Sequence, residues 1–176
     1  MQTNFSEVKH EGAISQSTEK LVAAVEAAYV RSGIYADTPQ ELADGIYVDI
    51  KYTPDLDTYR EGLIKYDIST LVPGSVKYTI LIACYINMDA DRRFDIYWVD
   101  PDWDSKTVTY NTRPQGRLIA EDVTFGGKGQ PLEVSAFIEE ALAIGDKIFS
   151  IRIVPKCQIG AGQTRIQFQA WKSRSS

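Results

Sequence analysis

The chain has 176 residues, 44% of them hydrophobic and 24% charged, and its 19 basic and 24 acidic residues give a net charge of −5. This length favours one domain with a core of its own. The acidic balance argues against a surface that binds nucleic acid, because phosphates are neutralised by dense Lys and Arg. The single histidine, His10, excludes a multi-histidine metal site and is the one base that a Ser-His-Asp triad could use.

Residues 1–20 are polar, and we expect a flexible leader before a single domain over residues 21–172. The start has no apolar segment of the kind that a secretory signal needs, and no apolar run reaches the roughly 20 residues of a membrane span. Leu21, Val25 and Ala28 then follow helical spacing with Gly33 placed to end a helix, so the residues by themselves favour a helix over 21–32.

Residues 32–45 are predicted to be a loop, and from residue 46 the hydrophobic period becomes two, which is typical of β-strands. One exception, AFIEEALAIG, predicts a short helix near 136–144 that Gly145 ends. Turn sequences such as PG and GAGQ separate the alternating runs, so the chain is predicted to be an all-β sandwich or barrel. The tail 173–176 is expected to be frayed. The predicted strands cover 46–51, 64–68, 76–86, 94–99, 107–111, 117–120, 148–154 and 164–171.

Three segments have compositions that occur in functional sites. DPDWD (100–104) has aspartates at alternate positions, as calcium sites do, but it lacks the Gly and Glu of an EF-hand loop, which favours a solvated turn with Trp103 at the sandwich edge. GGKGQP (126–131) lacks the Gly-Lys-Ser/Thr of a phosphate loop and is interpreted as a flexible loop. Glu139 and Glu140 are neighbours on the predicted helix, so they point to different faces and do not form a facing acid–base pair.

The two cysteines, Cys84 and Cys157, lie far apart in the sequence. Such thiols are more often buried and reduced than bridged, and a disulfide stays open as the alternative. Because no CxxC spacing occurs, we expect no structural zinc site.

Basic side chains lie beside tyrosines at four places along the predicted strands. Because neighbouring strand residues point to opposite faces, Lys51 and Lys65 are predicted to stand on outer sheet faces. They could pair there with the carboxylates of an anionic sugar chain, with Arg doing so through two parallel hydrogen bonds. The alternative, which the residues alone favour, is that they keep the sheet soluble and pair with Asp49, Asp67 and Glu61. The pairs are Arg31 with Tyr29, Lys51 with Tyr52, Arg60 with Tyr59 and Lys65 with Tyr66.

Several stretches, taken in order, resemble the DNRLRE domain family, which overlaps an alginate-binding family of carbohydrate-binding modules. The resemblance implies a β-jelly-roll sandwich. It also implies a strand over about 26–31, in place of the helix that periodicity favours there. The matching stretches are VEAAYVRSG, LIKYDISTLVPGSVKYTILIACYI (63–86), VDPDWDSKTVTYNTRPQG (99–116), PLEVSAFIEEALAIGDKIFSIRI (131–153) and TRIQFQAWKS.

The resemblance implies a non-catalytic module that recognises an acidic, uronate-containing polysaccharide. In alginate-binding members, basic residues of the early strands hold the uronate carboxylates, and the matching positions here are Arg31, Lys51, Arg60 and Lys65. It further implies a secreted or cell-surface protein in which enzyme or surface domains are linked to the module. We expect no cofactor or metal other than a structural calcium at DPDWD, and no nucleic-acid partner.

Two other functions stay open on the sequence. A jelly roll can be a structural or adhesive surface module without a sugar site, since a fold does not determine a function. A polysaccharide lyase or hydrolase of this fold is the second alternative. The lone histidine in the leader and the lack of a facing carboxylate pair argue against it.

Overall fold

The computed structural model describes residues 19–22, 24–42, 47–74, 76–85, 92–124, 130–158, 164–167 and 171–175. Within these ranges the regular structure is mostly β. The strands are β1 (Glu19–Val22), β2 (Ala24–Arg31), β3 (Tyr47–Ile50), β4 (Arg60–Asp67), β5 (Val76–Tyr85), β6 (Arg92–Val99), β7 (Gly116–Thr124), β8 (Gln130–Glu133), β9 (Ile148–Gln158), β10 (Thr164–Gln167) and β11 (Trp171–Ser175). The helices are the α-helix α1 (Ser135–Ala143) and two short 3-10 helices, η1 (Gly33–Tyr35) and η2 (Leu56–Thr58).

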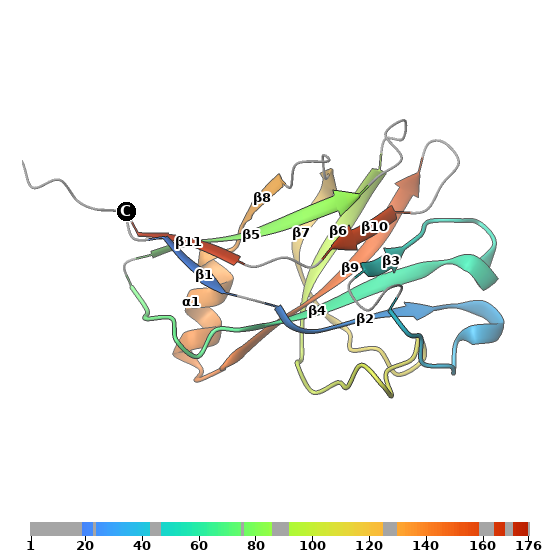
Figure 1. Ribbon diagram of the computed structural model, residues 1–176, viewed down its shortest axis with the longest axis horizontal. Helices are drawn as coiled ribbons and strands as arrows, with labels where there is room; N and C mark the ends of the chain where they lie inside the picture. Colours follow the sequence, from blue (N-terminus) through green and yellow to red (C-terminus); the bar gives the residue numbers. More distant parts are fainter. Residues whose placement is uncertain are drawn as a thin grey trace, which may run out of the picture.

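The strands form two antiparallel sheets (Figure 1). One sheet has the order β2-β4-β9-β6-β7, and the other has the order β1-β11-β5-β10-β3 with β8 also paired to β5. The chain crosses from one sheet to the other at most of its connections, as it does in a jelly roll. The predicted all-β sandwich with one short helix is therefore confirmed.

The main core lies between the two sheets and comes from alternate residues of the strands. On β4, Ile64 and Tyr66 lie opposite Ile151 and Phe149 of β9, and all four side chains are buried. Cross-strand neighbours of this kind pack on one face of a sheet and stabilise it together. The alternation that predicts β9 from the sequence is one of apolar and polar side chains, since Ser150 and Arg152 between the core residues are buried as well.

The helix α1 packs Ile138 against this core and ends where the sequence predicts. Gly145 has a left-handed backbone with φ of +88°, which a residue without a Cβ adopts readily. Its N–H donates to the carbonyl of Leu142 at 3.1 Å, and the N–H of Asp146 donates to the carbonyl of Ala141 at 2.9 Å. These two bonds form a Schellman motif, which satisfies the last carbonyls of the helix.

The helix that periodicity favours over 21–32 is wrong, because Ala24–Arg31 forms β2 and pairs with β4. Ala27 and Ala28 are both buried, one on each face of the sheet, whereas Val25 is 55% exposed. A strand buried on both faces loses its period-two alternation, and its apolar residues here match helical spacing by coincidence. The strand that the family resemblance implies over 26–31 is confirmed.

Residues 100–115, which we call the cover loop, fold over the outer face of the five-stranded sheet. The indole Nε1–H of Trp103 donates to the hydroxyl of Ser150 on β9 at 2.9 Å. The loop therefore buries the sheet on its second face as well. The apolar side chains of this second cluster are Ala28, Val30, Leu63, Val99, Trp103 and Val108.

The predicted strand over 107–111 is wrong, because this part of the cover loop uses its backbone groups locally. The N–H of Val108 donates to the carbonyl of Asp104 at 2.8 Å. The N–H of Thr109 donates to the hydroxyl of Thr112 at 2.9 Å. Local bonds of this type compete with pairing in a sheet, so the β-branched residues here build a turn instead of a strand.

The two ends of the described chain lie together, because β1 pairs with β11 and places Glu19 opposite Arg174. Residues 19–20 of the expected leader and 173–175 of the expected tail thus lie in paired strands. Within the described residues, no helix combines the length and the apolarity that crossing a membrane requires.

Candidate functional site

Three of the four predicted binding residues lie side by side at one corner of the sandwich. Arg31 ends β2 and lies opposite Arg60, the first residue of β4. An isolated bridge places Lys51 opposite Arg60 on the other side. Residues opposite each other in antiparallel pairs are about 4.5–5.5 Å apart and project from the same face. The three residues therefore form one row, the cationic corner, at the end of β2 and the start of β4 (Figure 1, right).

The guanidinium of Arg31 is held from two sides. Its Nε–H donates to the carbonyl of Asp57 in η2 at 2.6 Å, and its central carbon lies 3.6 Å from the ring centre of Tyr35 in η1. No carboxylate among the described residues forms an ion pair with it. The two terminal nitrogens therefore present a fork that matches a carboxylate, fixed in position before any ligand binds.

Lys51 and Arg60 differ in their partners. Lys51 has no ion pair within the described part of the chain. Arg60 donates from Nη1 to Oδ2 of the buried Asp49 at 3.0 Å, and its guanidinium lies 5.5 Å from the ring centre of Tyr29. Like charges placed opposite each other are destabilising, and Asp49 pairs with one of the three cations. The corner therefore keeps Arg31 and Lys51 available for an anionic ligand.

The tyrosines that neighbour Lys51 and Arg60 in the sequence meet each other and the cover loop. Tyr52 and Tyr59 meet edge to face with their ring centres 6.5 Å apart, and Tyr59 meets Tyr110 of the cover loop at 6.2 Å. Burial, followed by the nearby negative charge of Glu61, raises the pKa of the Tyr59 hydroxyl, so this group stays neutral. Tyr52 is 39% exposed and offers the open ring of the set, next to Lys51.

The fourth predicted residue, Lys65, lies outside the cationic corner. It is five positions along β4 from Arg60, and odd spacings on a strand point to opposite faces. Its ammonium donates to Oε2 of Glu26 at 2.7 Å and to the carbonyl of Trp103, and its side chain is 11% exposed. Lys65 thus fastens the cover loop to the sheet.

Stability should depend on the protonation of Glu26. Burial raises the pKa of this carboxyl, but hydrogen bonds from Lys65 and from the backbone and side chain of Ser105 outweigh that effect and hold the pKa below its ordinary value. The folded state therefore binds this proton more weakly than the unfolded chain does. The contribution to stability is present above pH 4.5, the ordinary pKa, and is lost as the pH falls through the lowered folded-state value. In urea titrations across this range, Glu26→Gln should flatten the fall in unfolding free energy; parallel curves would contradict the assignment.

A second buried carboxylate, Glu61, holds the cover loop at its other end. Its Oε2 accepts from Nε of Arg113 at 2.8 Å and lies 3.6 Å from Nε of Arg152. Arg152 also donates to the carbonyl of Pro114 at 2.8 Å. Glu61 is 3% exposed, so this ion cluster is part of the interior of the protein.

The acids expected to neutralise the candidate cations therefore behave differently from one another. Asp49 pairs with Arg60, as the alternative interpretation of the sequence predicts. Glu61 pairs with arginines of the cover loop and β9 instead. Asp67 accepts the backbone N–H of Ser69 at 2.9 Å, and hydrogen bonds from the side chain and the backbone of Ser69 lower the pKa of the Asp67 carboxyl.

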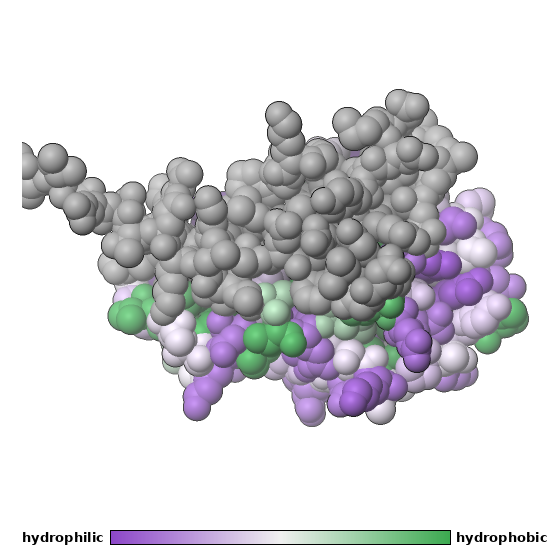
Figure 2. Space-filling view, in the orientation of Figure 1, coloured by the Kyte–Doolittle hydropathy of each residue, from purple (hydrophilic) through white to green (hydrophobic). Residues whose placement is uncertain are grey.

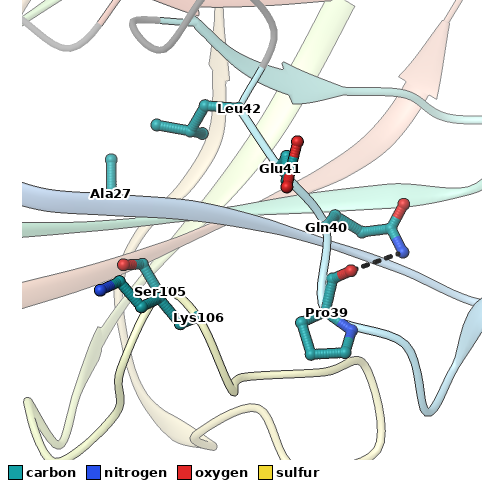
Figure 3. A pocket seen from close by; sticks show the side chains of 7 residues that line it. All are labelled: Ala27, Pro39, Gln40, Glu41, Leu42, Ser105 and Lys106. Atoms are coloured by element: carbon teal, nitrogen blue, oxygen red, sulfur yellow. Dashed lines mark hydrogen bonds between the residues drawn. The ribbon is translucent and has the colours of Figure 1, made fainter.

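A pocket of about 480 Å³ lies beside β2, about 13 Å along the strand from Arg31 at 3.3 Å per residue. Figure 3 shows Ser105 and Lys106 of the cover loop on one side of β2, and the segment 39–42 passing across the strand so that Glu41 and Leu42 lie on the other side. The amide of Gln40 donates to the carbonyl of Pro39 at 3.3 Å. Among the described residues that line the pocket, Lys106 and Glu41 balance each other in charge and none is aromatic, so the cationic corner is the stronger candidate for an anionic ligand.

The other predicted candidates are placed as follows. Asp100 accepts the N–H of Asp102 at 2.9 Å, and Asp104 accepts the N–H of Lys106 at 2.7 Å, so both support the turn. Across the described ranges, no three His, Cys, Asp or Glu side chains gather as metal ligands do; the calcium stays a prediction. His10, residues 126–129 and the side chains of Cys84 and Cys157 lie outside the described residues.

The two helix glutamates point apart, as predicted. Glu139 accepts the N–H of Gly74 at 3.0 Å, whereas Glu140 pairs with Arg117 of β7 at 2.6 Å. They hold different elements against α1, and neither faces the other as an acid and a base of a glycosidase would.

A family model described as carbohydrate-binding module family 96 matches residues 18–175. The chain belongs to carbohydrate-binding module family 96. No curated protein sequence matches it. As a member of this family it is a non-catalytic module that binds carbohydrate, which confirms the general part of the resemblance. The DNRLRE and alginate-binding parts stay predictions.

In this member of carbohydrate-binding module family 96, sequence reasoning noticed the tyrosines but did not assign them to a site. The adjacent pairs Lys51–Tyr52 and Tyr59–Arg60 were the available signal. Tyr35 had no such signal, because its place under Arg31 depends on how η1 folds back against η2, where the N–H of Ile34 donates to the Asp57 carboxylate at 2.8 Å.

Proposed function

We propose that this module binds an acidic, uronate-containing polysaccharide at the cationic corner. The observation that supports the proposal is the environment of Arg31. Its guanidinium contacts Asp57 and Tyr35 but has no ion pair among the described residues. Arg31 can hold one sugar carboxylate through two parallel hydrogen bonds, and Lys51 can hold another as a point charge.

Tyr52 supplies the apolar part of such a site. Its ring is 39% exposed and leans on Tyr59, so it is ordered without being covered. An exposed tyrosine offers an apolar face and a polar tip, which suits the apolar C–H face and the hydroxyls of a sugar ring. The corner thus combines charge recognition with a contact surface.

The net charge of −5 makes this recognition local. At physiological salt, charges are screened beyond about 8 Å, so a polyanion at contact distance experiences the cations of the corner more than the acids elsewhere. Affinity for a uronate chain should therefore fall as salt rises, because the attraction depends on exposed charges.

The alternative role as an adhesive or structural surface has less support. Such a role calls for a broad apolar face, whereas the exposed large apolar residues of the described chain come from several separate segments. Figure 2 shows hydrophobic residues (green) as small groups among hydrophilic ones (purple) on the described part of one face. Secretion, and linkage to enzyme or surface domains, are parts of the proposal that the family resemblance suggests.

The test is the double variant Arg31→Gln/Lys51→Gln, titrated by calorimetry with an oligouronate hexasaccharide at low and high salt. Loss of charge-assisted hydrogen bonds should weaken binding by about tenfold or more. The matched control is Lys147→Gln/Lys156→Gln, which removes two exposed positive charges from another part of the protein and should leave the affinity nearly unchanged.

Equal losses in the two double variants would show a general charge effect and contradict the site. Salt-independent binding of the oligouronate would contradict recognition by charge. Lys65→Gln separates structure from binding, because it should lower the unfolding free energy while the folded variant keeps its affinity.

A further inference from the structure

A groove, which we call the α1 groove, lies between α1 and the end of β6. It is at the end of the five-stranded sheet opposite to the cationic corner. Its volume is about 540 Å³, within the range of small-ligand sites. The first residue of β4, Arg60, belongs to the cationic corner. The last, Asp67, lies opposite Ile148 of β9, which follows the groove residue Asp146 by two positions. At about 3.3 Å per residue, seven positions separate them by roughly 20 Å.

The centre of this groove is an ordered ion pair. Arg117 of β7 donates to both carboxylate oxygens of Glu140 on α1, at 3.1 and 2.6 Å. Its guanidinium also lies between two rings, 4.9 Å from the centre of Trp98 and 5.3 Å from that of Phe137. Both charged side chains remain about half exposed. The pair therefore presents N–H donors and carboxylate acceptors to solvent in a fixed arrangement.

The charge of this groove is opposite to that of the cationic corner. Arg117 and Glu140 neutralise each other, while Asp100 and Asp146 also line the groove. An anionic sugar would be repelled by the two additional carboxylates. The rim of the groove is apolar at Ile144, which is 68% exposed.

We infer that this α1 groove is a second saccharide-binding site and that it takes a neutral sugar residue. A neutral sugar has hydroxyls that can donate to the carboxylates and accept from Arg117, and an apolar C–H face that fits Ile144. The inference goes beyond the proposed function, since it concerns another surface and another class of sugar.

The test uses the full chain and three neutral probes: cellohexaose, xylohexaose and mannohexaose. We expect at least one of them to shift the amide NMR signals of residues 98–100 and 117, with little dependence on salt. Glu140→Gln should then weaken that binding by about tenfold, because the acceptor loses its charge. Glu121→Gln is the matched control, since this exposed carboxylate pairs with Lys156 outside the groove at 2.8 Å.

A second variant, Ile144→Ser, covers the case in which Glu140→Gln disturbs α1. Ile144 is largely exposed, so its change should leave the fold intact and still reduce the affinity. No shift with any neutral probe, or shifts with a cationic chitosan oligosaccharide alone, would overturn the inference. Neutral-sugar binding should survive Arg31→Gln/Lys51→Gln, and oligouronate binding should survive Glu140→Gln, so the two sites can fail separately.

Discussion

Replacing Glu61 by glutamine should lower the free energy of unfolding by about 3 kcal/mol or more, because breaking a buried ion pair leaves its partner charges uncompensated. Glu61 is 3% exposed and is the shared partner of Arg113 and Arg152. Glutamine keeps the size of the side chain but removes the charge that both guanidinium groups face. Urea unfolding monitored by circular dichroism measures the change.

Glu121→Gln is the control for this stability measurement. Glu121 pairs with Lys156 at 2.8 Å, but it is 63% exposed, and exposed pairs of this kind contribute about 0–1 kcal/mol. Equal losses in the two variants would contradict a buried structural role for Glu61. A third variant that replaces Glu61, Arg113 and Arg152 together by apolar residues should recover part of the stability, since no charge is then left buried without a partner.

Replacing Gly33 by alanine should destabilise the cationic corner by about 2–4 kcal/mol, of which roughly 1–2 comes from the left-handed backbone and the rest from the displacement of η2. Gly33 has φ of +67°, and a Cβ there would lie 1.9 Å from Oδ1 and 2.6 Å from Cα of Asp57. Backbone atoms cannot move aside as a flexible side chain can. The carbonyl of Asp57 also positions Arg31, so oligouronate affinity should fall together with stability.

Gly145→Ala is the matched control. Gly145 also has a left-handed backbone, but nothing lies within 4 Å of the place where its Cβ would be. It should show the backbone cost without the displacement, and it should leave oligouronate binding unchanged. If Gly33→Ala bound oligouronate as the wild type does, η2 would have no part in positioning Arg31.

The sequence predicts most of the strands because burial on the inner face of a sheet repeats every second residue. β4 and β9 are clear in the sequence for this reason, and Gly145 marks the end of α1 because the Schellman motif is a local feature. β2 misleads the same approach, because its second face under the cover loop carries the apolar Ala28 and Val30, whereas that of β9 carries the polar Ser150 and Arg152. Residues 107–111 cause the opposite error, a strand predicted where none forms. Their β-branched side chains are typical of strands but here belong to a turn that packs on a sheet.

The cationic corner was only partly predictable. The sequence shows which cations stand beside tyrosines, but the register between β2, β4 and residue 51 decides which of them meet. Nothing near Lys65 in the sequence indicates that Trp103, 38 positions away, covers its ammonium. Contacts of that separation are set by the path of the cover loop over the whole sheet, which periodicity does not describe.

The pairing of β1 with β11 has a mechanical consequence. The backbone of Glu19 is in register with that of Arg174, and the β1–β11 pair lies far from the end of β2 and the start of β4 in Figure 1. Tension applied through both chain ends would load the hydrogen bonds of this pair one after another, as in a zipper, instead of shearing them all at once. The outermost pair would then yield first and at low force, while the sheet that carries Arg31 and Arg60 stays folded.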